Sequence, residues 1–302
     1  FIFKASITAS KPFSRRLKSE GERLVRIKRK SLLLLVLGLV FLVQAGGIAW
    51  SQVTERVSVD SFGAEGDDSS TDSSNSSDGR YVAFESFATN LVANDTNTDK
   101  DIFVHDRQTG TTNRVSVDSG GNETLDPSRA SSISGDGMHV AFESDADLDL
   151  VAGDANPFSD MFVRDLLAVT TTLVSVDSTG AQDIGPSVSP SVSSDGRYVA
   201  FQSDADLVLP DNGFIDIYVH DRDADDDGIY DEAGSIGTVR VSVDAAGIQG
   251  QGNNHSYVPS ISGDGRYVAF ESIATDLVAG GSNGFIHIFV HDRDTDGDGI
   301  YD

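Results

Sequence analysis

The sequence has 302 residues, with 22 Lys+Arg against 48 Asp+Glu, and it contains no cysteine. The lack of cysteine excludes a disulfide scaffold, a thiolate metal site and a cysteine nucleophile. The net charge of −26 argues against nucleic-acid binding, because phosphate contacts require clustered Lys and Arg. The length allows two average domains or one large β architecture.

The first 51 residues differ in charge from the rest of the chain. They hold 10 Lys+Arg and 2 Asp+Glu, which leaves 12 and 46 for residues 52–302. A basic stretch at Arg26–Lys30 precedes the apolar run Leu32–Val43, and Ala49-Trp50-Ser51 offers small residues at the positions that a signal peptidase recognises. Residues 1–51 are therefore predicted to be a leader with a secretory signal peptide, cleaved near Ser51.

Two further expectations concern this leader. Residues 1–24 precede the basic stretch, which suggests that translation starts inside the sequence, near Val25. The alternative to cleavage is a membrane anchor, because Leu32–Trp50 approaches the ~20 residues that span a bilayer. Residues 52–302 contain no second apolar run of that length. The protein is thus expected to be exported to the periplasm, the cell surface or the medium, with no membrane span in the mature body.

Residues 52–302 contain a repeat in four copies, recognised by three motifs. The first is a Ser/Gly-Asp-Gly turn before an apolar segment, found at 77–86, 135–144, 194–203 and 263–272. The second, typified by Asp-Ile-Phe-Val-His-Asp-Arg, occurs at 101–107, 160–165, 216–222 and 287–293. The third, typified by Arg-Val-Ser-Val-Asp, occurs at 56–60, 114–118, 173–177 and 240–244. The units span about 61–118, 119–177, 178–244 and 245–302.

Each motif has the composition of a short β-strand, being β-branched and aromatic between turn residues. The strands are apolar on both faces, which is typical of strands covered on both sides. Asp-Gly predicts a tight hairpin with positive φ at both central residues. A short segment before the turn supplies a further strand, although in the first unit it lacks apolar residues at 73–77 and is expected to fray. Four antiparallel strands per unit, repeated radially, predict an all-β chain folded as a β-propeller.

The repeats resemble the WD-like repeats of TolB-type β-propellers. Ser-x-Asp-Gly-Arg-Tyr-Val-Ala-Phe and Asp-Ile-Phe-Val-His-Asp-Arg are similar to that family's Ser-Pro-Asp-Gly-x-x-Ile-Ala-Phe and Asp-Ile-Tyr-x-x-Asp. The resemblance covers residues 53–302. Here Ser or Gly replaces the family's turn proline, and the units are long, near 58 residues. The resemblance implies a propeller fold and indicates little about activity, because propellers serve many unrelated roles.

The four repeats do not by themselves define the number of blades in the propeller. Residues 53–60 supply a fourth-strand motif with no unit before it, and the sequence ends at Asp302, before the fourth strand of the last unit. The N-terminal strand is one candidate to complete the last blade. The interpretation that we favour is a truncated propeller, with four blades out of six to eight.

Two acidic loops have the spacing of calcium ligands. Both read Asp-x-Asp-x-Asp-Gly-Ile-Tyr-Asp, with side-chain oxygens at positions 1, 3, 5 and 9, a backbone carbonyl at position 7 and a turn-forming glycine at position 6. The predicted Ca²⁺ ligands are Asp223, Asp225, Asp227, the Ile229 carbonyl and Asp231, and then Asp294, Asp296, Asp298, the Ile300 carbonyl and Asp302.

These loops are similar to the calcium loops of EF-hand, dockerin and thrombospondin type-3 repeats. They depart from the EF-hand at position 12, where Gly234 replaces the bidentate glutamate. The alternative is a solvated acidic hairpin that binds no ion. Asp95–Asp99 is a weaker candidate, for which an Asx-turn is the preferred interpretation.

Signals of catalysis are weak. Gly280–Gly284 matches a nucleophile elbow in letters but lacks the strand-to-helix context. His105, His220 and His291 recur at one position of the repeat, which indicates packing and hydrogen bonding, and no zinc signature occurs. The sequence therefore favours an exported, non-catalytic propeller that binds Ca²⁺ and presents a surface to a protein or glycan. The alternative is a propeller-based hydrolase or lyase, or the propeller portion of a larger peptidase.

Overall fold

The computed structural model describes residues 53–146, 149–210, 213–243 and 254–301. Contacts divide the chain into two units, Phe1–Glu55 and Arg56–Asp302, and every element below belongs to the second. The expected signal peptide, anchor and start site lie outside the described residues. None of the described residues belongs to a helix of the length and apolarity needed to cross a bilayer.

The second unit is built from four antiparallel sheets, each formed by consecutive strands. The first sheet contains β1 (Ser70–Asn75), β2 (Tyr81–Ser86), β3 (Asp101–Asp106) and β4 (Thr111–Arg114). The second contains β5 (Ser128–Ile133), β6 (His139–Ser144), β7 (Asp160–Asp165) and β8 (Thr170–Leu173). The third contains β9 (Ser187–Val192), β10 (Tyr198–Ser203), β11 (Asp216–Asp221) and β12 (Gly237–Arg240). The last contains β13 (Ser256–Ile261), β14 (Tyr267–Ser272) and β15 (His287–Asp292).

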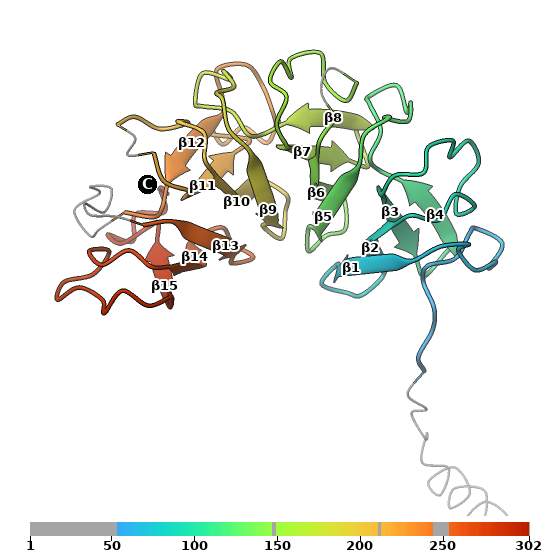
Figure 1. Ribbon diagram of the computed structural model, residues 1–302, viewed down its shortest axis with the longest axis horizontal. Coiled ribbons are helices and arrows are strands. Elements are labelled where there is room, and N and C mark those ends of the chain that lie inside the picture. The colour runs from blue at the N-terminus through green and yellow to red at the C-terminus, as the bar shows by residue number, and fades with distance from the viewer. Residues whose placement is uncertain (1–52, 147–148, 211–212, 244–253, 302) are drawn as a thin grey trace, which may run out of the picture. The chain divides into compact units, whose positions relative to one another are not determined.

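The predicted all-β architecture of antiparallel blades is confirmed. Three sheets have four strands, and the last sheet has three among the described residues. The sheets follow one another in chain order along an arc (Figure 1). The first strands of neighbouring sheets contact one another, β1 with β5, β5 with β9 and β9 with β13. This serial contact of sheets is the arrangement of propeller blades.

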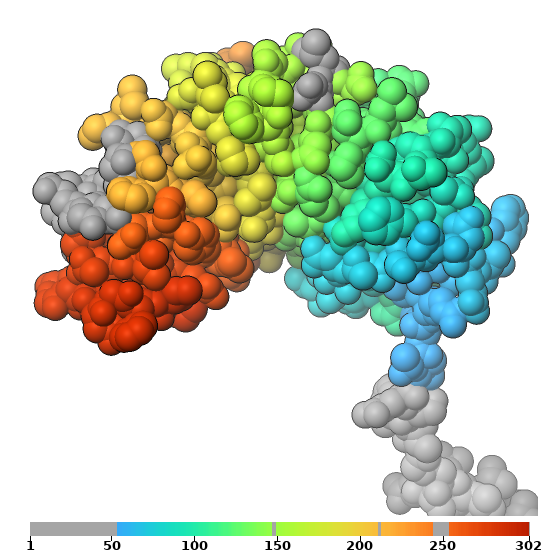
Figure 2. Space-filling model, in the orientation of Figure 1, coloured from blue at the N-terminus to red at the C-terminus, as the bar shows by residue number. Residues whose placement is uncertain are grey.

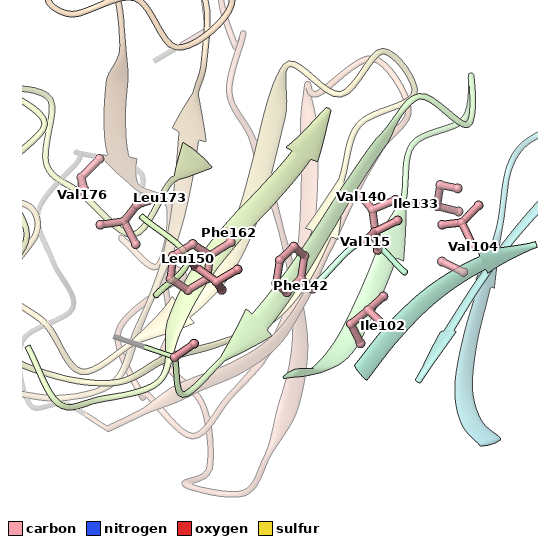
Figure 3. Close-up of a cluster of buried hydrophobic side chains, with 12 residues drawn as sticks. Ile102, Val104, Val115, Ile133, Val140, Phe142, Leu150, Phe162, Leu173 and Val176 are labelled. Atoms are coloured by element: carbon pink, nitrogen blue, oxygen red, sulfur yellow. The ribbon is translucent and has the colours of Figure 1, made fainter. Parts of the chain in front are cut away.

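The apolar core lies between the sheets (Figure 3). Phe142 and Phe162 of the second sheet pack in one cluster with Ile102 and Val104 of the first. The opposite face of the second sheet, which includes Val163, packs in another cluster against the third. An inner sheet therefore needs apolar residues on both faces, which explains why its strands do not alternate in polarity.

The turn before the second strand of each sheet differs from the predicted two-residue hairpin. Gly79 has a φ of 68°, but Asp78 does not lie in the positive-φ region. The Gly79 N–H donates to the Ser76 carbonyl over 2.9 Å, and the Asp78 carboxylate accepts the Ser76 hydroxyl and the Arg80 N–H. Serine and aspartate thus stabilise a longer turn in which glycine alone is left-handed.

The third motif also differs from its prediction. The fourth strand ends at the position of Arg114, so Val115-Ser116-Val117 lies beyond β4. The Val115 N–H still donates to Ile102 of its own sheet, whereas the Val117 carbonyl accepts the Thr171 hydroxyl of the next sheet over 2.6 Å. The motif is therefore a strap that passes from one blade to the next.

The first strand of each sheet contains an irregularity at an equivalent position. Its pairing with the second strand shifts register around a residue of positive φ, as at Ala130 in β5 and Val258 in β13. The polar strand β1, expected to fray, pairs with β2 and has the same bulge at Asp72. Register is set by the partner strand and the bulge, so a strand without apolar residues can still join the sheet.

Candidate metal centres

The acidic loop of the third blade lies between β11 and β12. Carboxylate oxygens of Asp223, Asp225 and Asp227 lie within 4.8 Å of one another. Asp223 is buried at the base of the loop, while Asp225 and Asp227 are exposed. The loop thus brings together three of the predicted ligands, with their oxygens close enough to bind one hard cation.

Backbone hydrogen bonds wind this loop around Asp223. The Asp227 and Gly228 N–H groups donate to its two carboxylate oxygens over 3.1 and 3.0 Å. Gly228 has a φ of 85°, so the glycine at position 6 provides the sharp turn that the pattern requires. The side chain of Ile229 is exposed, which agrees with a position that contributes its backbone rather than packing.

Asp231 is not part of this carboxylate group. Both its oxygens accept hydrogen bonds from the Arg222 guanidinium, over 2.9 and 2.6 Å. Arg222 is buried and also donates to the Gly196 carbonyl in the turn of the same sheet. The carboxylate at position 9 therefore fixes a buried arginine, and the sequence pattern assigned it to the ion because spacing alone does not reveal that partner.

Tyr230 connects the loop to the second blade. Its ring centroid lies 5.4 Å from that of His139, and the Arg222 guanidinium lies 4.9 Å from its centroid. Burial raises the pKa of Tyr230 to about 12, so it stays neutral at physiological pH. The loop is consequently held between two blades, a role of Tyr230 that the spacing of the aspartates does not indicate.

The loop of the last blade repeats much of this geometry. Asp294, Asp296 and Asp298 lie within 4.8 Å of one another. Tyr301 packs on Tyr198 of the third blade, with ring centroids 5.4 Å apart. The Ile300 side chain is exposed, and Asp302 lies outside the described residues, so its expected role as a ligand stays a prediction.

Arginine positions distinguish the two loops. Arg266 Nη1 lies 3.5 Å from an oxygen of Asp294, inside the carboxylate group of the last blade. The equivalent Arg197 contacts Asp226 instead, which lies outside the group of the third blade. The group in the third blade thus has no direct arginine contact among the described residues.

A further acidic group lies in the first blade and consists of Asp95, Asp101 and Glu123. Arg114 Nη1 contacts all three, at 3.3, 3.0 and 2.6 Å. Burial, with the nearby Asp101 charge, raises the pKa of Asp95 to about 7. Since a guanidinium already occupies this group, a structural ion-pair network is its simplest explanation. The expected Asx-turn is present, because the Asp99 N–H donates to Asn97 Oδ1.

The recurring histidines have the packing role that the sequence indicated. His105 Nδ1 lies 2.8 Å from Thr112 Oγ1, and His220 Nδ1 lies 2.9 Å from Thr238 Oγ1. Burial lowers the pKa of His220 to about 4. In Gly280–Gly284, the Ser282 hydroxyl donates to the Ala274 carbonyl in a loop, so it does not form a nucleophile elbow.

Comparisons with known proteins give similarities to solved structures. No protein-family model matches the sequence, and no curated protein matches it closely enough to be reported. TolB from Acinetobacter baumannii is 17% identical over 76% of this chain and 42% of that chain, with a TM-score of 0.42. A putative TolB from Agrobacterium tumefaciens is 18% identical over 74% and 61%, with a TM-score of 0.43. A tricorn protease is 11% identical over 68% and 19%, with a TM-score of 0.41. The chain covers less than two thirds of each of these proteins.

Proposed function

We propose that the chain is an exported, non-catalytic β-propeller scaffold that binds Ca²⁺ through its two acidic loops. The observation that supports this most directly is the repetition of one carboxylate group. Asp223, Asp225 and Asp227 converge in the third blade, and the same positions converge in the last. In each loop a glycine of positive φ directs its N–H toward the first aspartate.

The physical argument concerns repulsion between the carboxylates. Three carboxylates within 4.8 Å of one another repel at neutral pH, and a divalent cation removes this repulsion. The Ile229 carbonyl, side-chain oxygens and water supply further ligands, while Asp231 holds Arg222 under the loop. Both loops pack through a tyrosine on the preceding blade, so a bound ion stabilises the contact between blades as well as its own loop.

The surface proposed for a protein or glycan partner lies beside these loops. A cavity of about 460 Å³ is lined by residues of the third and last blades, including Tyr198, Tyr301, Arg197, Asp221 and Asp264. Aromatic rings beside fixed charges suit sugar rings or polar peptides, which need stacking and hydrogen bonds together. Because Tyr301 belongs to the acidic loop of the last blade, ion binding and the shape of this cavity are coupled.

Calcium titration of the chelator-treated chain tests the proposal. Millimolar Ca²⁺ is expected to raise Tm, because an ion that binds only the folded state stabilises it, and Mg²⁺ is expected to do so less. Asp225→Asn with Asp227→Asn should remove part of the rise, and the matched change at Asp296 and Asp298 another part. The control is Asp204→Asn, an exposed aspartate outside both loops. An unchanged Tm in Ca²⁺ would contradict the metal site, and turnover of peptides or oligosaccharides would contradict the non-catalytic role.

A further inference from the structure

The second blade departs from the repeat at two positions that carry arginine in the other blades. Arg197 and Arg222 represent these positions in the third blade, and the first and last blades have arginine at both as well. In the second blade the same positions are Met138 and Leu166. The second blade therefore presents apolar side chains where every other blade presents a guanidinium.

The β7–β8 hairpin of the second blade departs from the repeat in the same direction. Leu167 and Val169 occupy the positions of Gln108 and Gly110 in the first blade, and they are 73% and 52% exposed. Val169 keeps the left-handed backbone of that glycine, with a φ of 60°. A β-branched residue is strained there. The hairpin thus holds an apolar side chain at a position where its turn favours glycine.

These side chains line a cavity of about 470 Å³ between the first and second blades, which lie side by side in Figure 2, blue to teal and green. From the first blade the buried Val104 and Val115 line it, together with the ring of Tyr81, which lies against Gly137. A cavity of this size, with apolar walls and a few polar groups, is typical of a small-molecule site. The second blade contributes the four residues that depart from the repeat: Met138, Leu166, Leu167 and Val169.

At the next two junctions an aromatic ring of the protein itself fills the equivalent place. Tyr230 of the third blade lies on His139, and Tyr301 of the last blade lies on Tyr198, with ring centroids 5.4 Å apart in both pairs. Tyr81 is the equivalent of His139 and Tyr198, but among the described residues no ring pairs with it. The short β7–β8 hairpin carries no tyrosine. The cavity is therefore the space that a ring occupies at the later junctions.

Two charged groups that line this cavity are neutralised by their own partners. The Asp106 carboxylate accepts hydrogen bonds from the Arg80 guanidinium on both oxygens, over 2.9 and 2.7 Å. Arg114 contacts the three carboxylates of the acidic group in the first blade. Neither group is therefore available to pair with a charged ligand.

Arg164 is the charged residue of the cavity that has only neutral partners. It replaces the histidine found at this position in the other three blades, and it is 6% exposed. Its Nη1 donates to the Asp118 carbonyl and to the Thr171 hydroxyl. Among the described residues its guanidinium makes no ion pair with a carboxylate. A buried guanidinium with neutral partners favours an anionic ligand, and its planar donors suit a carboxylate.

We propose that this cavity binds a small aromatic carboxylate, with its ring beside Tyr81 and its carboxylate on the Arg164 guanidinium. The ring takes the place that Tyr230 and Tyr301 have at the later junctions, and the apolar side chains of the second blade cover it. Stacking and a charge-assisted pair then act on one molecule. Neither acidic loop lines this cavity, so the site is separate from the proposed calcium sites.

Methyl NMR of the two methionines tests binding directly. Met138 lines the cavity, whereas Met161 is fully buried between the second and third blades. Phenylacetate should shift the Met138 methyl saturably through its ring current, with a Kd on the order of 1 mM or below, and should move the Met161 methyl much less. Acetate has the charge alone and phenethyl alcohol the ring alone, so each should bind at least ~10-fold more weakly.

Two variants that restore the repeat separate the two ends of the ligand. Arg164→His introduces the histidine of the other blades, and it should weaken phenylacetate binding about 10-fold without changing that of phenethyl alcohol. Val169→Gly with Leu167→Ser should weaken both ligands at least ~3-fold, while Tm stays the same or rises because the turn is relaxed. Leu125→Ser is the matched control, since Leu125 is 69% exposed and lies outside the cavity, and it should change neither affinity.

Three results would overturn the proposal. The first is the lack of a saturable Met138 shift up to about 10 mM phenylacetate, a range that covers weak binding of a ligand of this size. The second is an equal effect of Arg164→His on phenylacetate and phenethyl alcohol, which would remove the role of the carboxylate. The third is unchanged affinity in the Val169→Gly and Leu167→Ser variant, which would place the ligand elsewhere.

Discussion

The third and last sheets have nearly the same sequence but different environments. Tyr-Val-Ala-Phe begins both β10 and β14, and Ile-x-Val-His-Asp recurs in β11 and β15. Val219 is fully buried, whereas the equivalent Val290 is 65% exposed. The comparison teaches that a strand in this fold does not bury its own side chains. Burial comes from the neighbouring sheet, so stability resides in the junctions, as in other repeat proteins.

The largest effect is expected when a charge is introduced at equivalent positions of the third and last sheets. Val219→Asp would bury an unpaired carboxylate between two sheets and should cost more than about 4 kcal/mol of unfolding free energy. Val290→Asp should cost less than about 1 kcal/mol, because the side chain remains in water. Urea unfolding of the two variants gives both values. Equal losses would show that a neighbour covers Val290.

Removal of the tyrosine ring at the start of the second strand should give the next largest difference in stability between the two sheets. Tyr198→Ala removes a ring packed on Gly265 and Tyr301, and we expect a loss of about 3 kcal/mol. Tyr267→Ala should cost less than about 1 kcal/mol under the same conditions. Thermal unfolding of the two variants measures the difference, and a larger loss at Tyr267 would reverse the comparison.

His220 and His291 occupy equivalent positions in the third and last sheets, but they should differ in their pKa and in how their protonation affects stability. Burial lowers the pKa of His220 to about 4, whereas an unfolded histidine titrates near ~6.5. The unfolded state therefore binds a proton first, and stability present above pH ~6.5 is lost as pH falls toward 4, by an amount on the order of 3 kcal/mol. Burial also lowers the pKa of His291, which is only half-buried.

NMR titration of the two imidazoles checks this prediction. His220 should remain neutral down to about pH 5, and His291 should protonate at a higher pH. His220→Asn should flatten the dependence of Tm on pH below 6.5 more than His291→Asn. A normal titration of His220 would contradict the burial described for β11.

The smallest difference between the third and last blades should be in the Ca²⁺ affinity of their acidic loops. Arg266 lies beside Asp294, whereas Arg197 contacts Asp226, outside the carboxylate group. The loop of the third blade should therefore bind Ca²⁺ more tightly by up to about 5-fold, since a partly exposed ion pair is worth roughly 0–1 kcal/mol. Calorimetry on chains with the other loop disabled by Asp→Asn changes measures each affinity. Arg266→Gln should remove the difference, and stronger binding in the last blade would contradict it.

The sequence predicted features that depend on short-range pattern. Tyr-Val-Ala-Phe identified strands covered on both faces, and Asp-x-Asp-x-Asp-Gly identified a loop in which Asp223, Asp225 and Asp227 converge. The location of the strands needed no knowledge of their neighbours, because composition and turn residues define them.

Features that depend on distant partners were missed. Asp231 fits a ligand position, but its partner is Arg222, a residue whose place under the loop depends on the turn at Gly196. The strap was predicted as a strand because β-branched residues look alike in sheets and in extended crossings. Glu85 and Gln202 occupy one position of the repeat, but the motif does not reveal that their side chains accept an N–H of the next blade.

The turn glycines have a consequence for how such chains change in length. Tyr81 meets Gly137 in the same way that Tyr198 meets Gly265, and the His139 ring takes this place at Gly196, so a ring against a turn glycine recurs at each junction of the described sheets. Duplication or loss of a whole unit during gene recombination would leave every remaining seam intact. The number of units can therefore vary among descendants of one gene while the folding instructions inside each unit stay the same.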